Sequence, residues 1–140
     1  MKVDISLSTK SIQGKIALIE REFPREIDNA LAKTAFYGSN IIQDRTNDGR
    51  GLKGMFKKYT PEYAEFRREK GRGSKVDLNF TGQMMGAMTV IKGRGYAEIR
   101  FNNALANKKA YFNNRTRPFF GFQVKERRQL IEFMKRRLFG

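Results

Sequence analysis

Carboxylates are the main side chains of this sequence that could act as acids, bases or metal ligands, because the chain contains neither histidine nor cysteine. Zinc and haem sites are therefore excluded, and any bound metal would need oxygen donors. The acidic residues around the first proline alternate with Arg21 and Arg25, which predicts ion pairs on solvated helical faces rather than a catalytic pair. These acidic residues are Glu20, Glu22, Glu26 and Asp28.

A second set of carboxylates, Asp44, Asp48 and Glu62, invites comparison with the magnesium ligands of a nuclease. A glycine-rich basic stretch separates them, so the sequence fixes no common geometry for the three groups. No segment fits the pattern G-x-x-x-x-G-K-[ST] of a phosphate-binding loop. We therefore predict a protein that is not an enzyme and that uses no cofactor and no metal ion.

Basic and aromatic side chains are interleaved near residues 111–120, and this cluster has two interpretations. Its rings could stack on bases while its guanidinium groups contact phosphates, as in proteins that bind single-stranded nucleic acid. Alternatively, the aromatic pair beside Pro118 could anchor a loop in the core or on a neighbouring subunit, which is the interpretation we favour. The cluster comprises Tyr111, Phe112, Arg115, Arg117, Phe119 and Phe120.

The chain is strongly basic, with 29 Lys and Arg against 14 Asp and Glu in 140 residues and a formal net charge of +15. Most of the excess falls in the second half of the chain. Such a charge favours polyanions, whether nucleic acid, an acidic protein surface or anionic lipid, without choosing among them. No stretch approaches the roughly 20 apolar residues that cross a bilayer, and Met1–Lys10 has no apolar run of signal-peptide length, so we predict no membrane contact.

A length of 140 residues suits a single domain with one core, and the spacing of apolar residues predicts both strands and helices within it. Alternating apolar side chains over Val3–Leu7 predict a first strand, and helical spacing follows from Ser11 to Phe23. Pro24 ends that segment and permits a second helix. The apolar stripe of the second helix comprises Ile27, Leu31, Ala35, Ile41 and Ile42.

The stretch Arg45–Lys58 contains an Asn-Asp-Gly turn signal and several glycines without a sustained period, which predicts a flexible, exposed basic loop. We treat its basic residues as candidates for assembly contacts: Arg45, Arg50, Lys53, Lys57 and Lys58. Thr60 and Pro61 have the pattern of an N-cap followed by proline at the first helical position, so a short helix is expected from Pro61 to about Lys70.

The second half of the chain predicts a β-hairpin between helices. Thr81 is a candidate N-cap for a brief helix, and Gly93-Arg94-Gly95 separates two strand-like runs near residues 88–101. Residues 104–111 are expected to be helical. A basic terminal helix is predicted from its apolar face, which comprises Val124, Ile131, Met134 and Leu138. The expected fold has N-terminal helices and a C-terminal helix packed on a small antiparallel β-sheet.

Two short motifs resemble a pattern of the tail-completion and virion-morphogenesis proteins of tailed bacteriophages. In that family a Leu-x-x-Thr-Gly element precedes a β-hairpin, and Leu78, Thr81 and Gly82 match it. A second family element, Arg-Pro-Phe-(Phe/Leu)-Gly, leads into the closing helix. It is matched by Arg117, Pro118, Phe119, Phe120 and Gly121. The resemblance covers about residues 25–138, and it departs from the family where many members carry a histidine just before the second element.

The resemblance implies a small structural subunit with an α+β fold, a single domain over residues 1–140. It would form a ring, expected to be a hexamer or a related multimer, where a DNA-filled head meets its tail. Its partners would be copies of itself and other neck, connector or tail proteins, with DNA in transit as an alternative partner for the basic surface. It would be made in the host bacterial cytoplasm and end in the virion.

A closed ring requires a heterologous interface, in which one surface of each subunit meets a different surface of the next. We interpret the residues of the two motifs, together with Arg115, as orientation or interface residues. The rival hypothesis is a monomeric protein that binds nucleic acid through its arginine, lysine and aromatic side chains.

Overall fold

The computed structural model describes residues 2–4, 21–78 and 82–139 of the chain. Within these ranges it contains a three-stranded antiparallel sheet, a second sheet of two short strands and five helices. The α+β class predicted from the sequence is therefore confirmed. The predicted N-cap at Thr81 and nearly all of the helix expected from Ser11 to Phe23 lie outside the described residues.

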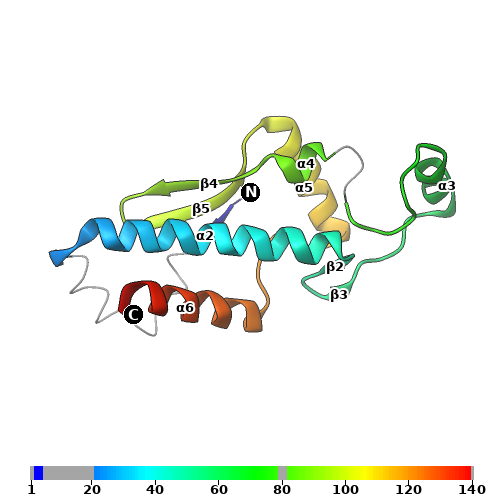
Figure 1. Ribbon diagram of the computed structural model, residues 1–140. Helices are drawn as coiled ribbons and strands as arrows, with labels where there is room; N and C mark the ends of the chain where they lie inside the picture. Colours follow the sequence, from blue (N-terminus) through cyan, green and yellow to red (C-terminus); the bar gives the residue numbers. More distant parts are fainter. Residues whose placement is uncertain (1, 5–20, 79–81, 140) are drawn as a thin grey trace.

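Helix α2, Pro24–Asn47, is the central element of the fold. Pro24 stands in its first turn, where a missing backbone N–H costs no helical hydrogen bond. In Figure 1 the strands β4 and β5 lie along one side of α2 and helix α6 lies along the other. The predicted apolar stripe is confirmed, since its members are buried except for the half-buried Ile41; the buried ones are Ile27, Leu31, Ala35 and Ile42.

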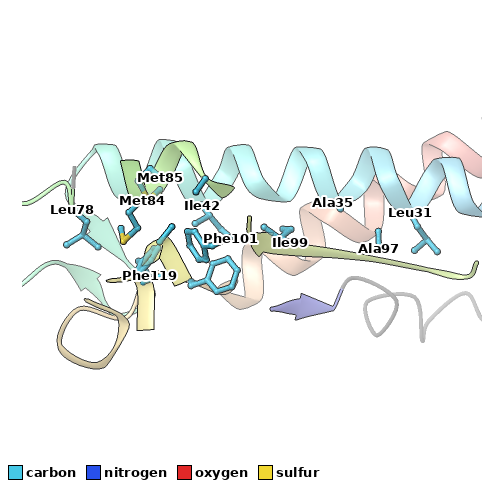
Figure 2. Packing of buried hydrophobic residues seen from close by; sticks show 14 of the residues in the cluster. Leu31, Ala35, Ile42, Leu78, Met84, Met85, Ala97, Ile99, Phe101 and Phe119 are labelled. Atoms are coloured by element: carbon cyan, nitrogen blue, oxygen red, sulfur yellow. The ribbon is translucent and has the colours of Figure 1, made fainter. Parts of the chain in front are cut away.

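The three-stranded sheet contains the predicted hairpin. Strand β4, Met88–Gly93, pairs antiparallel with β5, Tyr96–Phe101, and the short β1, Val3–Asp4, pairs with the other side of β5. Because side chains alternate along a strand, one face of β5 is directed towards α2. Figure 2 shows the buried side chains of β5 beside those of α2, and together they form the centre of the core: Ala97, Ile99 and Phe101 with Leu31, Ala35 and Ile42.

Two helices flank the hairpin in the sequence. Helix α4, Gln83–Gly86, precedes it and buries Met84 and Met85. Helix α5, Ala104–Thr116, follows it and continues beyond the predicted end at Tyr111. Asn103 begins α5 as an N-cap, because its side-chain oxygen accepts a hydrogen bond of 2.8 Å from the backbone N–H of Ala106.

Helix α6, Val124–Phe139, closes the chain and packs along α2. The predicted apolar face is right for Met134, which is buried, while Ile131 and Leu138 are half-buried. It is wrong for Val124, which is 65% exposed. The buried side chain in the first turn is instead Glu126, because this carboxylate has a charged partner inside the protein, as described below.

Residues 48–78 form an excursion that we call the arm. It contains β2, Arg50–Gly51, which pairs with β3, Gly54–Met55, and helix α3, Pro61–Glu69. Figure 1 shows α3 set apart from the rest of the molecule, at the end of the arm. The predicted N-cap is confirmed, because the Thr60 side chain accepts a hydrogen bond of 3.3 Å from the backbone N–H of Tyr63.

The prediction of a flexible loop over Arg45–Lys58 is wrong in two respects. Helix α2 continues through Asn47, so Arg45 belongs to a helix, and residues 50–55 form a two-stranded hairpin. The turn signal of Asn47-Asp48-Gly49 was correct, because Gly49 has a φ of +80°. It marks the end of α2 and the beginning of the arm.

Candidate functional site

The two motifs that carry the family resemblance lie side by side. Leu78 and Gly82 from the first motif and Arg117 from the second line the same hollow of about 520 Å³. Leu78 and Phe119 also belong to one hydrophobic core, and both appear near Met84 in Figure 2. Segments that are about 35 residues apart in the sequence therefore form one site.

The two described residues of the first motif, Leu78 and Gly82, both have a positive φ. Leu78 has a φ of +57°, which is unusual for a residue with a side chain, and it is nevertheless buried. Gly82 has a φ of +79° and occupies the N-cap position of α4. Glycine suits this position because it adopts a positive φ without steric cost. Gly82 thus begins the short helix that leads into the hairpin.

The aromatic pair of the second motif is anchored in the core. Phe119 is fully buried and Phe120 nearly so, with ring centroids 6.5 Å and 5.0 Å from that of Phe101. The side-chain oxygen of Asn114 accepts hydrogen bonds of 2.9 Å and 3.0 Å from the backbone N–H groups of both phenylalanines. The anchoring interpretation of this pair is confirmed, and neither ring is accessible for stacking on a nucleic-acid base.

Arg117 connects the second motif to the arm. Its Nε donates a hydrogen bond of 2.7 Å to the carbonyl oxygen of Lys57, and a terminal nitrogen donates one of 3.1 Å to that of Lys58. The guanidinium carbon lies 4.8 Å from the centre of the Tyr59 ring, within cation–π range. One side chain therefore fixes three consecutive residues at the base of α3.

The hairpin of the arm is held against the same segment. The backbone N–H of Leu52 donates a hydrogen bond of 2.8 Å to the carbonyl of Pro118, and the Gln123 amide donates to the carbonyls of Gly51 and Leu52 at 3.3 Å each. A Cβ atom at Gly51 would lie 2.2 Å from the carbonyl oxygen of Pro118, so only glycine fits there. A Cβ atom at Gly121 would lie 3.2 Å from a methyl group of Leu52.

The segment Arg117–Gln123, to which the arm is attached, is called the joint below. Arg45 and Glu126 form a buried ion pair next to it. Arg45 also donates hydrogen bonds of 2.6 Å and 3.2 Å to the carbonyl oxygens of Phe119 and Gly121. Glu126 additionally accepts one of 2.7 Å from the backbone N–H of Gln123. The prediction of Arg45 as an exposed assembly residue is therefore wrong, because its guanidinium group has partners inside the protein.

Helix α3 itself contains a second buried arginine. Arg67 is 2% exposed, and it donates hydrogen bonds of 2.9 Å to the carbonyl of Gly73 and 3.2 Å to the carboxylate of Asp77. Its guanidinium carbon lies 5.0 Å from the centre of the Tyr59 ring. Burial raises the pKa of the Tyr59 phenol, and the positive charge of Arg67 offsets part of that rise. Tyr59 thus contacts Arg67 of the arm and Arg117 of the second motif.

The remaining predicted site residues are on the surface. Arg115 is exposed on α5, together with Tyr111 and Phe112, which are both 52% exposed. Arg50 lies 3.5 Å from Asp48 in an exposed ion pair. Lys53, Lys57 and Lys58 are exposed along the arm. Thr81 falls outside the described residues, and the N-cap position predicted for it at the start of α4 belongs to Gly82, so that prediction is wrong.

The carboxylates considered as magnesium ligands occupy separate elements: Asp44 is on α2, Asp48 at its end and Glu62 on α3. Across residues 2–4, 21–78 and 82–139, no three carboxylates are grouped as a metal site would require. No helix in these ranges is both long and apolar enough to span a membrane. Comparison of the chain with protein-family models, curated proteins and solved structures gives no match.

Several residues that build the site were not singled out from the sequence. Arg67 and Asn114 carry no local signal, because their partners are set by the fold. Glu126 has only half of one: a glutamate three residues into a helix commonly accepts a hydrogen bond from the N-cap backbone N–H, as Glu126 does from Gln123, but Gln123 is not the Ser or Thr that completes the signal. The burial of Glu126 depends on its pairing with Arg45, which lies outside this local pattern.

Proposed function

We propose that this protein is a structural, non-catalytic subunit of the neck or tail-completion region of a tailed bacteriophage, where it forms a ring at the head-to-tail junction. The observation that carries the proposal is the meeting of the two family-like motifs at one hollow, with Leu78 and Gly82 on one side and Arg117 on the other. The contacts of both motifs set the directions of the arm, the hairpin and the last helix. Such a role needs fixed geometry and no reactive group.

The shape of the molecule supports a heterologous interface. The arm carries α3 away from the body in Figure 1, while its base is fixed by Arg117 and Arg67. A projecting element with a rigid base can reach a neighbouring subunit without the entropy loss of ordering a loose loop. A ring needs such an asymmetric pair of surfaces on each subunit.

The first test is the oligomeric state of the purified full-length chain, measured by light scattering after size-exclusion chromatography and by negative-stain electron microscopy. We expect closed rings, or co-assembly with a portal-connector or tail-tube protein. The genes that flank this one provide a second test, since portal, capsid and tail genes are expected there. A chain that stays monomeric at high concentration and binds no such partner would falsify the proposal.

A second candidate function is nucleic-acid binding, favoured by the exposed basic and aromatic side chains of α5: Lys108, Lys109, Tyr111, Phe112 and Arg115. Exposed rings between cations are typical of surfaces that bind single strands. This function predicts an affinity for single-stranded DNA that falls steeply with salt and that is lost more strongly in Phe112→Ala than in Phe36→Ala, an exposed phenylalanine of α2.

A further inference from the structure

The outer face of α3 is acidic, in a protein whose net charge is +15. Arg67 is buried and defines the inner face of this helix. With 100° between successive residues, the three glutamates of α3 lie roughly opposite Arg67. They are Glu62, Glu65 and Glu69, and all three are exposed. Arg68 pairs with Glu65, which leaves the face with a net negative charge.

An aromatic ring lies at the edge of this acidic face. Phe66 is 42% exposed, and its helical position is next to those of Glu62 and Glu69. The outer face of α3 therefore has a row of glutamates with an apolar ring along one edge, and the Nζ of Lys70 lies 5.7 Å from the centre of that ring. A surface that binds it should combine apolar side chains with positive charges.

Helix α5 presents a surface of that kind. It turns Ala106 and Ala110 inward and contains no acidic residue. Its outer face is a stripe in which apolar and basic side chains alternate at intervals of three and four residues. The stripe comprises Leu105, Lys108, Phe112 and Arg115, and all four residues are exposed. Exposed apolar side chains that share a helix face commonly mark an interaction site.

The two faces cannot meet within one copy of the chain. Tyr63 and Arg67 on the inner side of α3 line the same hollow as Lys109 and Asn113 of α5. Turning the outer face of α3 towards its own α5 would require α3 to rotate about its axis. That rotation would break the hydrogen bonds from Arg67 to Gly73 and Asp77.

We propose that the outer face of α3 in one copy docks on the outer face of α5 in a second copy, with Phe66 against Leu105 and Phe112 and with glutamates near Lys108 and Arg115. The interface is heterologous, since each copy offers α3 to one neighbour and α5 to the other. This inference rests on the proposed function, and it identifies the surfaces through which the ring closes.

A charge-swap experiment tests this interface. The first variant, Glu62→Lys with Glu69→Lys, makes the α3 face positive; the second, Lys108→Glu with Arg115→Glu, makes the α5 face negative. Each variant alone should weaken self-association roughly ten- to hundredfold, because attraction becomes repulsion at two sites. An equimolar mixture should assemble again, with the two variants alternating around the ring. Sedimentation velocity at low salt measures all three outcomes.

Matched controls separate this interface from the general effect of charge. Glu22→Lys with Glu26→Lys and Lys33→Glu with Lys92→Glu change the net charge equally at other exposed positions, and assembly should persist in both. Circular dichroism verifies that every variant is folded. Phe66→Ser should weaken assembly as the first variant does, without any change of charge.

The outcomes distinguish this interface from the function on which it rests. If the wild-type chain forms rings and the swapped pairs behave like the controls, or if mixing restores nothing, the interface is wrong and the proposed function stands. A wild-type chain that never self-associates overturns the interface, and it overturns the proposed function as well if the chain also binds no portal-connector or tail-tube protein. If Lys108→Glu with Arg115→Glu lowers affinity for single-stranded DNA more than Lys33→Glu with Lys92→Glu and leaves assembly unchanged, α5 binds nucleic acid instead.

Discussion

Arg45 of α2 and Glu126 of α6 form an ion pair inside the protein, although 81 positions separate them in the sequence. Two buried charges are stable only if they are paired and if their remaining donors and acceptors find partners. Here the carbonyls of Phe119 and Gly121 and the backbone N–H of Gln123 supply partners for most of them, while the Nε of Arg45 is buried without a hydrogen bond. The pair therefore joins the central helix, the second motif and the terminal helix at one point.

Removing one charge of this pair should be costly. Arg45→Met leaves the Glu126 carboxylate buried without its counter-charge, and we expect a loss of about 3–5 kcal/mol in the free energy of unfolding. Urea unfolding followed by circular dichroism measures this loss. Arg50→Met, which removes an exposed pair with Asp48, is the control and should cost less than about 1 kcal/mol. Equal losses in the two variants would show that the buried pair has no special role.

Gly51 should not tolerate a side chain. The Cβ atom of Gly51→Ala would lie 2.2 Å from the Pro118 carbonyl oxygen, so the hairpin of the arm must move away from the second motif. We expect a destabilisation of about 1–3 kcal/mol by overpacking. Gly86→Ala is the matched control, because nothing lies within 4 Å of the added atom, and its melting temperature should stay close to that of the wild type. A Gly51→Ala protein as stable as the wild type would contradict the close contact between Gly51 and the Pro118 carbonyl.

Arg117 should control the mobility of the arm. Arg117→Lys keeps the charge but loses the planar group that bonds the carbonyls of Lys57 and Lys58 and lies over Tyr59. Hydrogen exchange is expected to rise several-fold in α3 and at its base, while exchange in α2 and α6 stays the same. Arg115→Lys, an exposed change two residues away, should leave every segment unchanged. Unaltered exchange in α3 would rule out this role of Arg117.

The N-terminal strand should weaken in acid. Lys2 donates a hydrogen bond of 3.1 Å to Glu98, and this contact, aided by the charge of Arg100, lowers the pKa of the Glu98 carboxyl despite an opposing effect of burial. Since the folded pKa lies below the unfolded one, the contribution is full above the unfolded pKa and is lost as the pH falls through the folded value. Unfolding midpoints of the wild type and Glu98→Gln should therefore converge below about pH 4. A constant difference across the pH range would contradict this.

Local signals sufficed to predict much of the fold. The apolar period of α2, the Thr60 cap and the glycine turn between β4 and β5 are each determined by residues within one or two turns of chain, and all three are confirmed. The terminal helix was also predicted from its period. The prediction is wrong in the first turn, where Val124 is exposed and Glu126 is buried instead. The burial of Glu126 depends on Arg45, which no local pattern includes.

The site was predictable only in part, because several of its contacts join residues far apart in the sequence. The second motif identified Arg117, Pro118 and Phe119, and the anchoring of the aromatic pair in the core was predicted from it. The contacts of Arg117 and Pro118 with the arm were not predicted, because they join segments about 60 residues apart. Arg45 was placed in a loop because glycine-rich turn signals follow it within a few residues. Its partners are more than 70 positions away, and such long-range pairing is invisible to periodicity. The use of these residues in assembly stays a prediction.

The joint at Arg117–Gln123 has a mechanical consequence. The arm is attached there through Leu52, Lys57 and Lys58, and the same segment leads directly into α6 through Gln123 and Glu126. A force applied to α3 would therefore be transmitted to α6, because, within the described residues, no flexible linker lies between the arm and the joint. A displacement of α3 by a bound neighbour would therefore also shift α6.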